Sequence, residues 1–188
     1  MSDHDYGQEA TVIGPVLSGP DQKLSRHVLG HYPTGVAVIT AVTPNGPVGL
    51  SMNSFTSLSL EPPLVLFCPA LNSSTWPLLR DAGDIAINVL SAGQESVSRL
   101  FASRVSDRFT SIDWTPGTNG APLLSDALGW LECSIEAEYP AGDHTVVTAR
   151  IQRMGVHDEI AAPLVYFRGS YYAGINEAVE AVEGRSNA

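Results

Sequence analysis

The segment Gly49–Phe67 reads GLSMNSFTSLSLEPPLVLF and concentrates short polar side chains ahead of an apolar run. Its hydroxyl and amide groups are those of Ser51, Asn53, Ser54, Thr56, Ser57 and Ser59. Side chains this small let a ligand approach the backbone while they supply donors and acceptors around its edge. The segment therefore favours a wall for a flat polar heterocycle. Ser and Thr also suit strands and helix caps, so a purely structural interpretation stays open.

A second polar group precedes an expected helix and consists of Asn72, Ser73, Ser74 and Thr75. The first backbone N–H groups of a helix lack partners, and the helix dipole favours negative charge at that end. We therefore expect this position to be able to hold a phosphate. The simpler alternative is that Ser74 or Thr75 only caps the helix.

Several other chemistries lack their motifs in this chain. Neither G-x-G-x-x-G nor G-x-x-x-x-G-K-[ST] occurs, which excludes a Rossmann or P-loop cradle, and no G-x-S-x-G elbow supports a nucleophilic serine. His27 and His31 stand four residues apart, but H-E-x-x-H chemistry and a third ligand are missing, so we expect no metal site. Cys68 and Cys133 lie in apolar stretches and are expected to be buried thiols without chemistry.

The elements that position these groups are mostly strands. A helix is predicted over 21–33, which opens on an Asp cap and stops at Pro33. Apolar or alternating runs predict strands over 35–43, 47–51, 53–59, 63–68, 84–90, 131–139, 144–154 and 163–167. Two further helices are predicted over 74–82 and 93–102, and turns over 44–46 and 140–144.

The pattern of these strands predicts their burial and pairing. The segment 63–68 is expected to be fully buried, 163–167 to be the last strand, and 131–139 to place Glu132, Ser134, Glu136 and Glu138 on a wet face. Consecutive strands joined by short turns indicate an antiparallel sheet. Their number indicates closure into a barrel with a few helices packed outside, a mainly β fold.

Composition bounds the class of protein. A chain of 188 residues forms one core by default, and we expect an arm over 1–21, a single domain over 22–175 and a tail over 176–188. The net charge of −10 opposes binding to nucleic acid, and no apolar run approaches the ~20 residues of a membrane span. The acidic N-terminus does not resemble a secretory signal, so the cytoplasm is the expected location.

A set of segments in matching order resembles the short-chain flavin reductase family. The segments are YPTGVAVITA (32–41), GLSMNSFTSLSLEPPLVLF (49–67), NSSTW (72–76), INVLSAGQESVSRLFA (87–102), DRF (107–109), GDH (142–144) and YFRGSYY (166–172). The resemblance covers about residues 22–173. It implies an FMN-binding split barrel, commonly a homodimer, that oxidises NADH or NADPH, reduces FMN or FAD and delivers reduced flavin to a partner monooxygenase.

The resemblance also implies roles for individual residues. Pro33 and Thr34 would lie near the isoalloxazine, while its polar edge would be lined by Ser51, Met52, Asn53 and Ser54, with Ser57 nearby. Asn72, Ser74 and Arg108 would reach the phosphate. His144 would contact the nicotinamide as the catalytic residue, and Tyr172 would close over that side. Met52 stands where relatives often carry a smaller residue.

Two alternatives to flavin release remain at this point. One is a flavin-binding or haem-binding split barrel that stores or senses its ligand without turnover. The other is a reductase that keeps its flavin bound and acts directly on an organic substrate. In the reductase interpretation the flavin carries the hydride chemistry and the protein places the two rings, so no acid/base pair is required.

Overall fold

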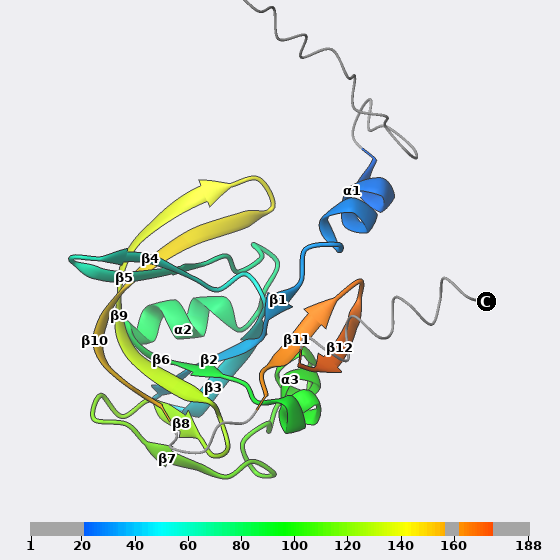
Figure 1. Ribbon diagram of the computed structural model, residues 1–188. Coiled ribbons are helices and arrows are strands. Elements are labelled where there is room, and N and C mark those ends of the chain that lie inside the picture. Colours follow the sequence, from blue (N-terminus) through cyan, green and yellow to red (C-terminus); the bar gives the residue numbers. More distant parts are fainter. Residues whose placement is uncertain (1–20, 157–161, 175–188) are drawn as a thin grey trace, which may run out of the picture.

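The computed structural model describes residues 21–156 and 162–174 of the 188-residue chain. Its main feature is a seven-stranded antiparallel sheet in the order β3-β2-β6-β9-β10-β5-β4 (Figure 1). The strands are β2 (Ala37–Thr43), β3 (Gly46–Met52), β4 (Thr56–Leu60), β5 (Pro63–Phe67), β6 (Asp84–Val89), β9 (Gly129–Ala141) and β10 (His144–Val156). The sheet curls on itself, but its edge strands β3 and β4 do not pair within the described residues, so the barrel is split rather than closed.

Two smaller sheets complete the β structure of the described residues. One has the order β1-β11-β12 and is formed by β1 (Thr34–Gly35), β11 (Leu164–Phe167) and β12 (Ser170–Ala173). The other pairs β7 (Trp114–Pro116) with β8 (Pro122–Leu124). The helices are α1 (Gln22–Leu29), α2 (Trp76–Ala82) and α3 (Glu95–Ala102), with the 3-10 turn η1 (Ala92–Gln94) directly before α3. None of the described helices is long and apolar enough to cross a membrane.

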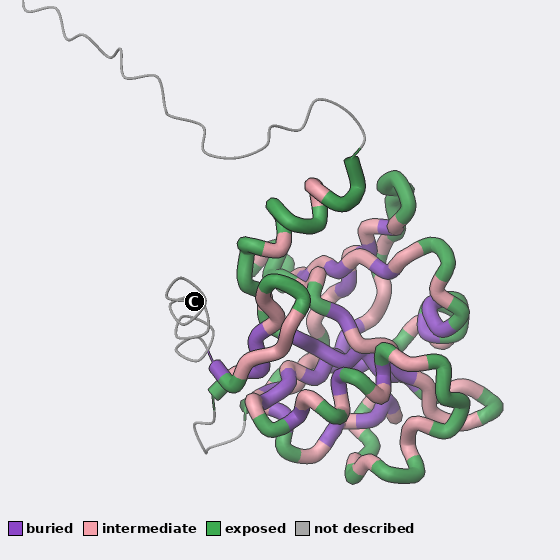
Figure 2. The backbone as a smooth tube through the Cα atoms, turned by 90° about the vertical axis from the view of Figure 1, so that its right-hand side faces the viewer, coloured by how far each residue is buried: buried purple, intermediate pink, exposed green. Residues whose placement is uncertain are grey.

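Strand β2 separates two hydrophobic clusters because its side chains alternate between the faces of the sheet. Ala37, Ile39 and Ala41 belong to the cluster on the concave side, whereas Val38 belongs to the cluster under α3 and β11. This explains why five consecutive residues of an antiparallel strand, Ala37–Ala41, are buried together. The buried central strands appear as the purple interior of Figure 2.

Helix α2 lies on the concave side of the curled sheet (Figure 1). Trp76 and Leu79 are buried in the concave cluster, and the Trp76 ring packs edge-on against Phe67 at a centroid distance of 5.6 Å. Among the few helices of the fold, α2 is the one that packs into the concave side. Its apolar residues fill the space that a closed barrel would fill with strand side chains.

A buried polar group holds the β7–β8 hairpin on the sheet. Asn88 of β6 donates through Nδ2 to the carbonyls of Val38 and Pro122 and accepts from the amide of Leu124. Glu132 is 1% exposed and accepts from the amide of Asn119. Glu132 was expected on a wet face, so that assignment was wrong: the hairpin covers this end of β9.

Most predicted elements are present. The predicted strand 63–68 is only half-buried, since Pro63 is exposed while Val65 and Phe67 are buried. The predicted strand 53–59 begins only at Thr56. The predicted last strand, β11, is followed by β12. The predicted tail and almost all of the predicted arm lie outside the described residues, and Asp21 caps α1 by accepting from the amides of Lys23 and Leu24.

Candidate functional site

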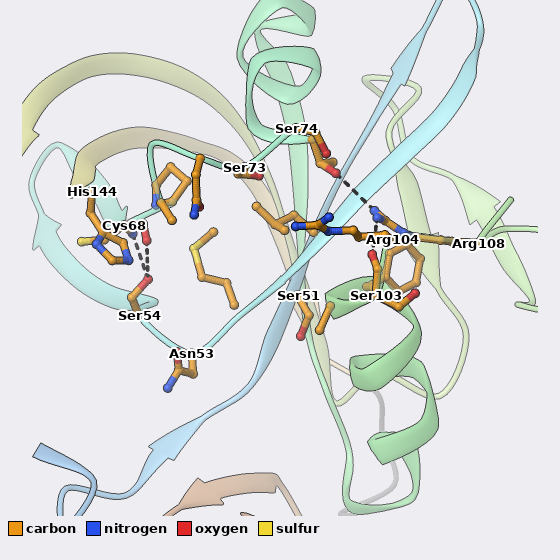
Figure 3. Close-up of a pocket in the computed structure, with 18 residues that line it drawn as sticks. Ser51, Asn53, Ser54, Cys68, Ser73, Ser74, Ser103, Arg104, Arg108 and His144 are labelled. Carbon is orange, nitrogen blue, oxygen red and sulfur yellow. Dashed lines mark hydrogen bonds between the residues drawn. The ribbon is translucent and has the colours of Figure 1, made fainter. Parts of the chain in front are cut away.

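A cavity of about 520 Å³ opens where β3, β5, the start of α2 and the end of α3 meet (Figure 3). Eight of the predicted site residues line it: Ser51, Met52, Asn53, Ser54, Asn72, Ser74, Arg108 and His144. The other lining residues include Leu50, Cys68, Pro69, Ser73, Thr75, Phe101, Ser103 and Arg104. Figure 3 shows His144 at one end of this cavity and Arg104 at the other. The volume lies within the ~300–1,000 Å³ typical of small-molecule sites.

The polar segment at the end of β3 and directly after it contains both hydrogen-bonded and free side chains. Ser51 Oγ lies 2.9 Å from Ser98 Oγ, and Ser98 Oγ donates to the Tyr171 hydroxyl. Ser54 Oγ accepts from the amide of Cys68 at 2.9 Å. These two serines therefore tie the cavity wall to α3 and to the end of β5. The side chain of Asn53 is exposed and makes no hydrogen bond within the described residues, so its amide is available to a ligand.

The loop before α2 forms the opposite wall. Thr75 is the N-cap residue of α2, as one of the two sequence alternatives expected, but its side chain makes no capping hydrogen bond, and Ser73 Oγ instead accepts from the amide of Trp76. Asn72 and Ser74 are exposed and make no side-chain hydrogen bond within residues 21–156 and 162–174. The cap thus leaves two polar side chains free at the cavity rim.

Two arginines four residues apart occupy the same end of the cavity in different ways. Arg108 donates to the carbonyl of Gly49 at 2.6 Å, to that of Ser103 at 2.5 Å and to Thr75 Oγ1 at 3.3 Å. Burial lowers the pKa of the Arg108 guanidinium. Arg104 is exposed and has no hydrogen bond or ion pair within the described part of the chain. Arg108 is therefore committed to the backbone, and Arg104 is the cation free to meet an anion.

His144 begins β10 and is held by its neighbours. Its Nδ1 lies 2.7 Å from Asp143 Oδ1. Because an ionised carboxylate only accepts, Nδ1 carries the proton, which leaves Nε2 as the ring nitrogen available to a ligand. The hydrogen bond from His144, followed by the charge of that ring, lowers the pKa of the Asp143 carboxyl. Backbone bonds from Leu71 N to Asp143 O and from Thr145 N to Pro69 O fix this turn against the α2 loop.

Four predicted site residues are not among those that line this cavity. Pro33 and Ser57 are exposed, and Thr34 Oγ1 is buried without a hydrogen-bond partner. Tyr172 packs against Phe167. Its neighbour Tyr171 lines a smaller cavity of about 220 Å³ together with Tyr166, Val36 and Met52. Tyr171 and Tyr172 are neighbours in β12, and successive strand residues point to opposite faces, so only one of the two side chains can face this smaller cavity. The roles of these four residues stay predictions.

Neither cysteine shows the marks of a nucleophile. Burial raises the pKa of the Cys68 thiol, and burial together with the charge of Glu132 raises that of Cys133 to about 12. Both thiols are therefore protonated at neutral pH. Within the described residues no group of three His, Cys, Asp or Glu side chains is placed to hold a metal ion.

Comparison with known proteins agrees with this geometry. The model of the flavin reductase like domain matches residues 29–174. A flavin reductase of Pseudomonas putida is 40% identical over 157 residues, which cover 83% of this chain and 92% of that protein. HsaB of Rhodococcus jostii (strain RHA1), the reductase subunit of a flavin-dependent monooxygenase, is 41% identical over 152 residues, which cover 80% of this chain and 77% of HsaB. The NADH:FAD oxidoreductase SgcE6 of Streptomyces globisporus C-1027 has been solved in complex with NAD and FAD fragments. It matches this chain with a TM-score of 0.79 and 35% sequence identity, over 87% of this chain and 99% of the SgcE6 chain.

The chain therefore belongs to the flavin reductase-like family. The split barrel and the mainly β fold expected from the sequence are confirmed. Within that family its relatives define it as an NAD(P)H-dependent flavin reductase.

The described residues fit a flavin. A flavin combines a flat ring, which needs polar contacts at its edge, with a chain that ends in phosphate. The free amide of Asn53 lies on one wall, the free side chain of Ser74 lies on the opposite wall, and the unpaired Arg104 lies at one end (Figure 3). The free side chain of Asn72 also lines the cavity. Apolar surface from the partly exposed Leu50 lines the space between them.

Proposed function

We propose that this chain uses the cavity beside β3 to place an FMN or FAD ring against NADH or NADPH, and that the reduced flavin serves a partner monooxygenase. The single observation that carries the assignment is the polarity of this cavity. Amide and hydroxyl side chains without hydrogen bonds in the described chain lie at its rim. The unpaired Arg104 lies at one end, and His144, whose Nε2 is available to a ligand, lies at the other. This arrangement suits two cofactors that must meet face to face.

Each residue has a placing role in this proposal. Asn53 binds the polar edge of the ring. Ser51 and Ser54 are small and hydrogen-bond to other elements, so their side chains fix the cavity wall and leave space for the ring. Asn72, Ser74 and Arg104 bind the ribityl phosphate, and Arg108 shapes this end through its bonds to Gly49 and Ser103. His144 presents Nε2 to the nicotinamide because Asp143 holds Nδ1.

The bound flavin supplies the acceptor for the hydride of the nicotinamide, a transfer that requires stacked rings with reacting atoms roughly 3–3.5 Å apart. The residues of the chain orient the two rings and prevent other arrangements of the rings in the cavity. No proton donor is required at the transfer itself, which agrees with a cavity whose only imidazole, within the described residues, lies at the nicotinamide end.

Assembly and location are part of the same proposal. We infer a homodimer in the cytoplasm. The homodimer is supported by α1, which presents apolar side chains that nothing in the described chain covers. An oxygenase partner is supported by relatives that are reductase subunits. HsaB and the stachydrine N-demethylase reductase subunit Stc3 are such subunits. The partner of this chain is proposed to be an oxygenase that accepts freely diffusing reduced flavin.

The direct test mixes the purified protein with NADH or NADPH and free riboflavin, FMN or FAD under anaerobic conditions. Loss of nicotinamide absorbance that depends on added flavin supports the proposal. Oxidation that proceeds without free flavin when an organic substrate is added would instead establish a bound prosthetic flavin. Tight retention of a coloured cofactor with negligible turnover would establish a storage or sensing protein.

A further inference from the structure

A second cavity of about 320 Å³ adjoins the candidate flavin cavity. The two share Ser74, Thr75, Arg104 and Arg108 in their walls. The second cavity lies between the start of β3, α2 and the loop that follows α3. It is therefore reached from the end of the flavin cavity that holds Arg104, opposite to the end that holds His144 (Figure 3).

Several apolar side chains line this second cavity, and two of them are exposed. Leu78 of α2 is 46% exposed and Val105 of the following loop is 52% exposed, although both are large aliphatic side chains. Val48 and Phe109 line the same space. Exposed apolar groups from separate elements that converge on one hollow indicate a ligand with an apolar or aromatic part. Hydroxyls of Ser74 and Ser106 at the same cavity suit a ribose.

Arg104 lies between the two spaces. It lines both cavities and makes no hydrogen bond or ion pair within the described residues, whereas Arg108 is already bonded to two carbonyls. The chain as a whole carries a net charge of −10, so a free guanidinium at this junction is the local feature that would attract an anion. A group that crosses from one cavity to the other would therefore carry its negative charge at Arg104.

We propose that the second cavity is the subsite for the adenosine diphosphate half of FAD, which makes FAD the preferred flavin of this enzyme. The pyrophosphate lies beside Arg104, and the adenosine lies among Leu78, Val105 and Phe109. This inference rests on the proposed function, since it takes the flavin ring to lie in the first cavity. FMN ends at its phosphate and leaves the second cavity unused.

NADH carries the same adenosine diphosphate chemistry. We assign the second cavity to FAD because of its position relative to His144. The nicotinamide is proposed to lie at His144, whereas the second cavity adjoins the opposite end of the first cavity, which holds Arg104. A flavin that spans the first cavity points its phosphate toward Arg104. The experiment below separates the two sources.

The test is to introduce a negative charge into the apolar wall with Leu78→Asp and, independently, Val105→Asp. Each variant is expected to raise the KM for FAD by about tenfold, the equivalent of losing ~1.4 kcal/mol of apolar contact and adding repulsion. The KM for FMN and the KM for NADH at saturating FMN are expected to stay within about twofold. Asp at the third position of α2 suits the helix N-terminus, and Val105 lies in a loop, so at least one variant is expected to fold.

Leu58→Asp is the matched control, because Leu58 is also 46% exposed but lies on the edge strand β4, away from both cavities. It should leave the KM for FAD unchanged. A second readout needs no turnover: ADP should displace FAD from the wild-type protein in a flavin-fluorescence titration and should not displace riboflavin.

Equal increases in KM for FAD and FMN, an increase confined to NADH, or failure of ADP to compete with FAD would each overturn the subsite. Failure of the proposed function is distinguishable from these results. It would appear as the absence of NADH-dependent or NADPH-dependent reduction of riboflavin, FMN and FAD alike in the wild-type protein.

Discussion

At the scale of single residues, the two arginines of the cavity show how similar side chains divide their work. Arg108 is partly buried and holds β3, the α2 cap and the end of α3 together through Gly49, Thr75 and Ser103. Arg104 touches the same cavity without any such partner in the described chain. A guanidinium whose fork is occupied by carbonyls is part of the scaffold, and one that is unoccupied is a binding group.

Replacing each arginine by methionine separates these roles. Arg108→Met is expected to lower the free energy of unfolding by about 2–3 kcal/mol, because the carbonyls of Gly49 and Ser103 lose a charged donor. Arg104→Met is expected to change it by less than about 0.5 kcal/mol, as for most exposed sites. Urea unfolding of the flavin-free proteins measures both. Equal losses in the two variants would mean that Arg104 also has a structural partner.

His144→Ala tests the nicotinamide end. The variant is expected to raise the KM for NADH about tenfold through loss of one imidazole contact, while the dissociation constant for flavin stays within about twofold. Steady-state kinetics and flavin titration measure the two quantities. His31→Ala is the matched control, since His31 is exposed on the segment after α1 and lines no part of this cavity. Parallel losses in both constants would remove His144 from its assigned role.

The same variant has a structural readout at Asp143. The hydrogen bond from His144 holds the pKa of the Asp143 carboxyl below its usual 3.8, so His144→Ala should raise it toward that value in an NMR titration. Because the folded-state pKa is depressed, the pair favours the folded state above the usual range of an Asp. That contribution disappears as the pH falls through the depressed pKa. An unchanged titration would show that the two side chains are not bonded in solution.

The sequence could predict this site only in part, and the reason lies in where the partners come from. The crowding of small polar residues from the end of β3 onward predicted a ligand wall, and eight predicted residues do line one cavity. Which of them are free could not be predicted, because Ser51 is bonded to Ser98 and Ser54 to Cys68, both distant in the chain. Arg104 lacks a local motif, and it was missed in favour of Arg108 in the DRF segment.

At the scale of elements, close contact between α3 and β3 positions the end of the cavity. Phe101 of α3 is fully buried, and a Cβ added at Gly49 would lie 2.5 Å from its Cε1 atom. Glycine at this position lets the helix approach the strand to the distance at which Arg104 and Ser103 reach the cavity. The position of the cavity end that holds Arg104 therefore depends on the absence of a side chain at Gly49.

Gly49→Ala is expected to destabilise the fold by about 1–3 kcal/mol, the usual result of overpacking, and to weaken flavin binding because α3 must shift. Thermal unfolding and flavin titration measure the two effects. Gly93→Ala is the matched control, since no atom lies within 4 Å of a Cβ built there. Full stability of Gly49→Ala would show that Phe101 can move without cost and would remove this contact as the determinant of the α3 position.

Two of the elements that sequence periodicity missed, β7 and β8, share a physical cause. Strands β7 and β8 have three residues each and are held by distant side chains, Asn88 and Glu132, rather than by a local apolar pattern. The period of 131–139 was read correctly as a strand, but the burial of Glu132 depends on the hairpin that covers it. Long strands such as β2 and β10 were predictable from their own residues, because β2 is a continuous β-branched and apolar run and the first half of β10 alternates between buried and partly exposed residues.

At the scale of the whole molecule, α1 projects from the barrel with little to hold it (Figures 1 and 2). It has eight residues, none of them buried, and isolated helices shorter than ~12–15 residues are marginal in water. Val28 and Leu29 at its C-terminal end are 56% and 72% exposed, and Tyr32 shortly after it is 77% exposed. A helix of this kind gains stability when its apolar side chains pack on another surface, which the proposed homodimer would supply.

The homodimer therefore makes a prediction about mass and about Leu29. Sedimentation equilibrium is expected to give about 40 kDa, twice the 20.0 kDa of one chain. Leu29→Asp is expected to weaken association by about tenfold or more, since a buried leucine contact is worth ~1.5–3 kcal/mol and a buried charge adds to its loss. Leu60→Asp is the control, because Leu60 is 89% exposed at the β4–β5 turn. A monomeric wild-type protein, or a Leu29→Asp variant that associates as tightly as the control, would mean that α1 does not form the dimer contact.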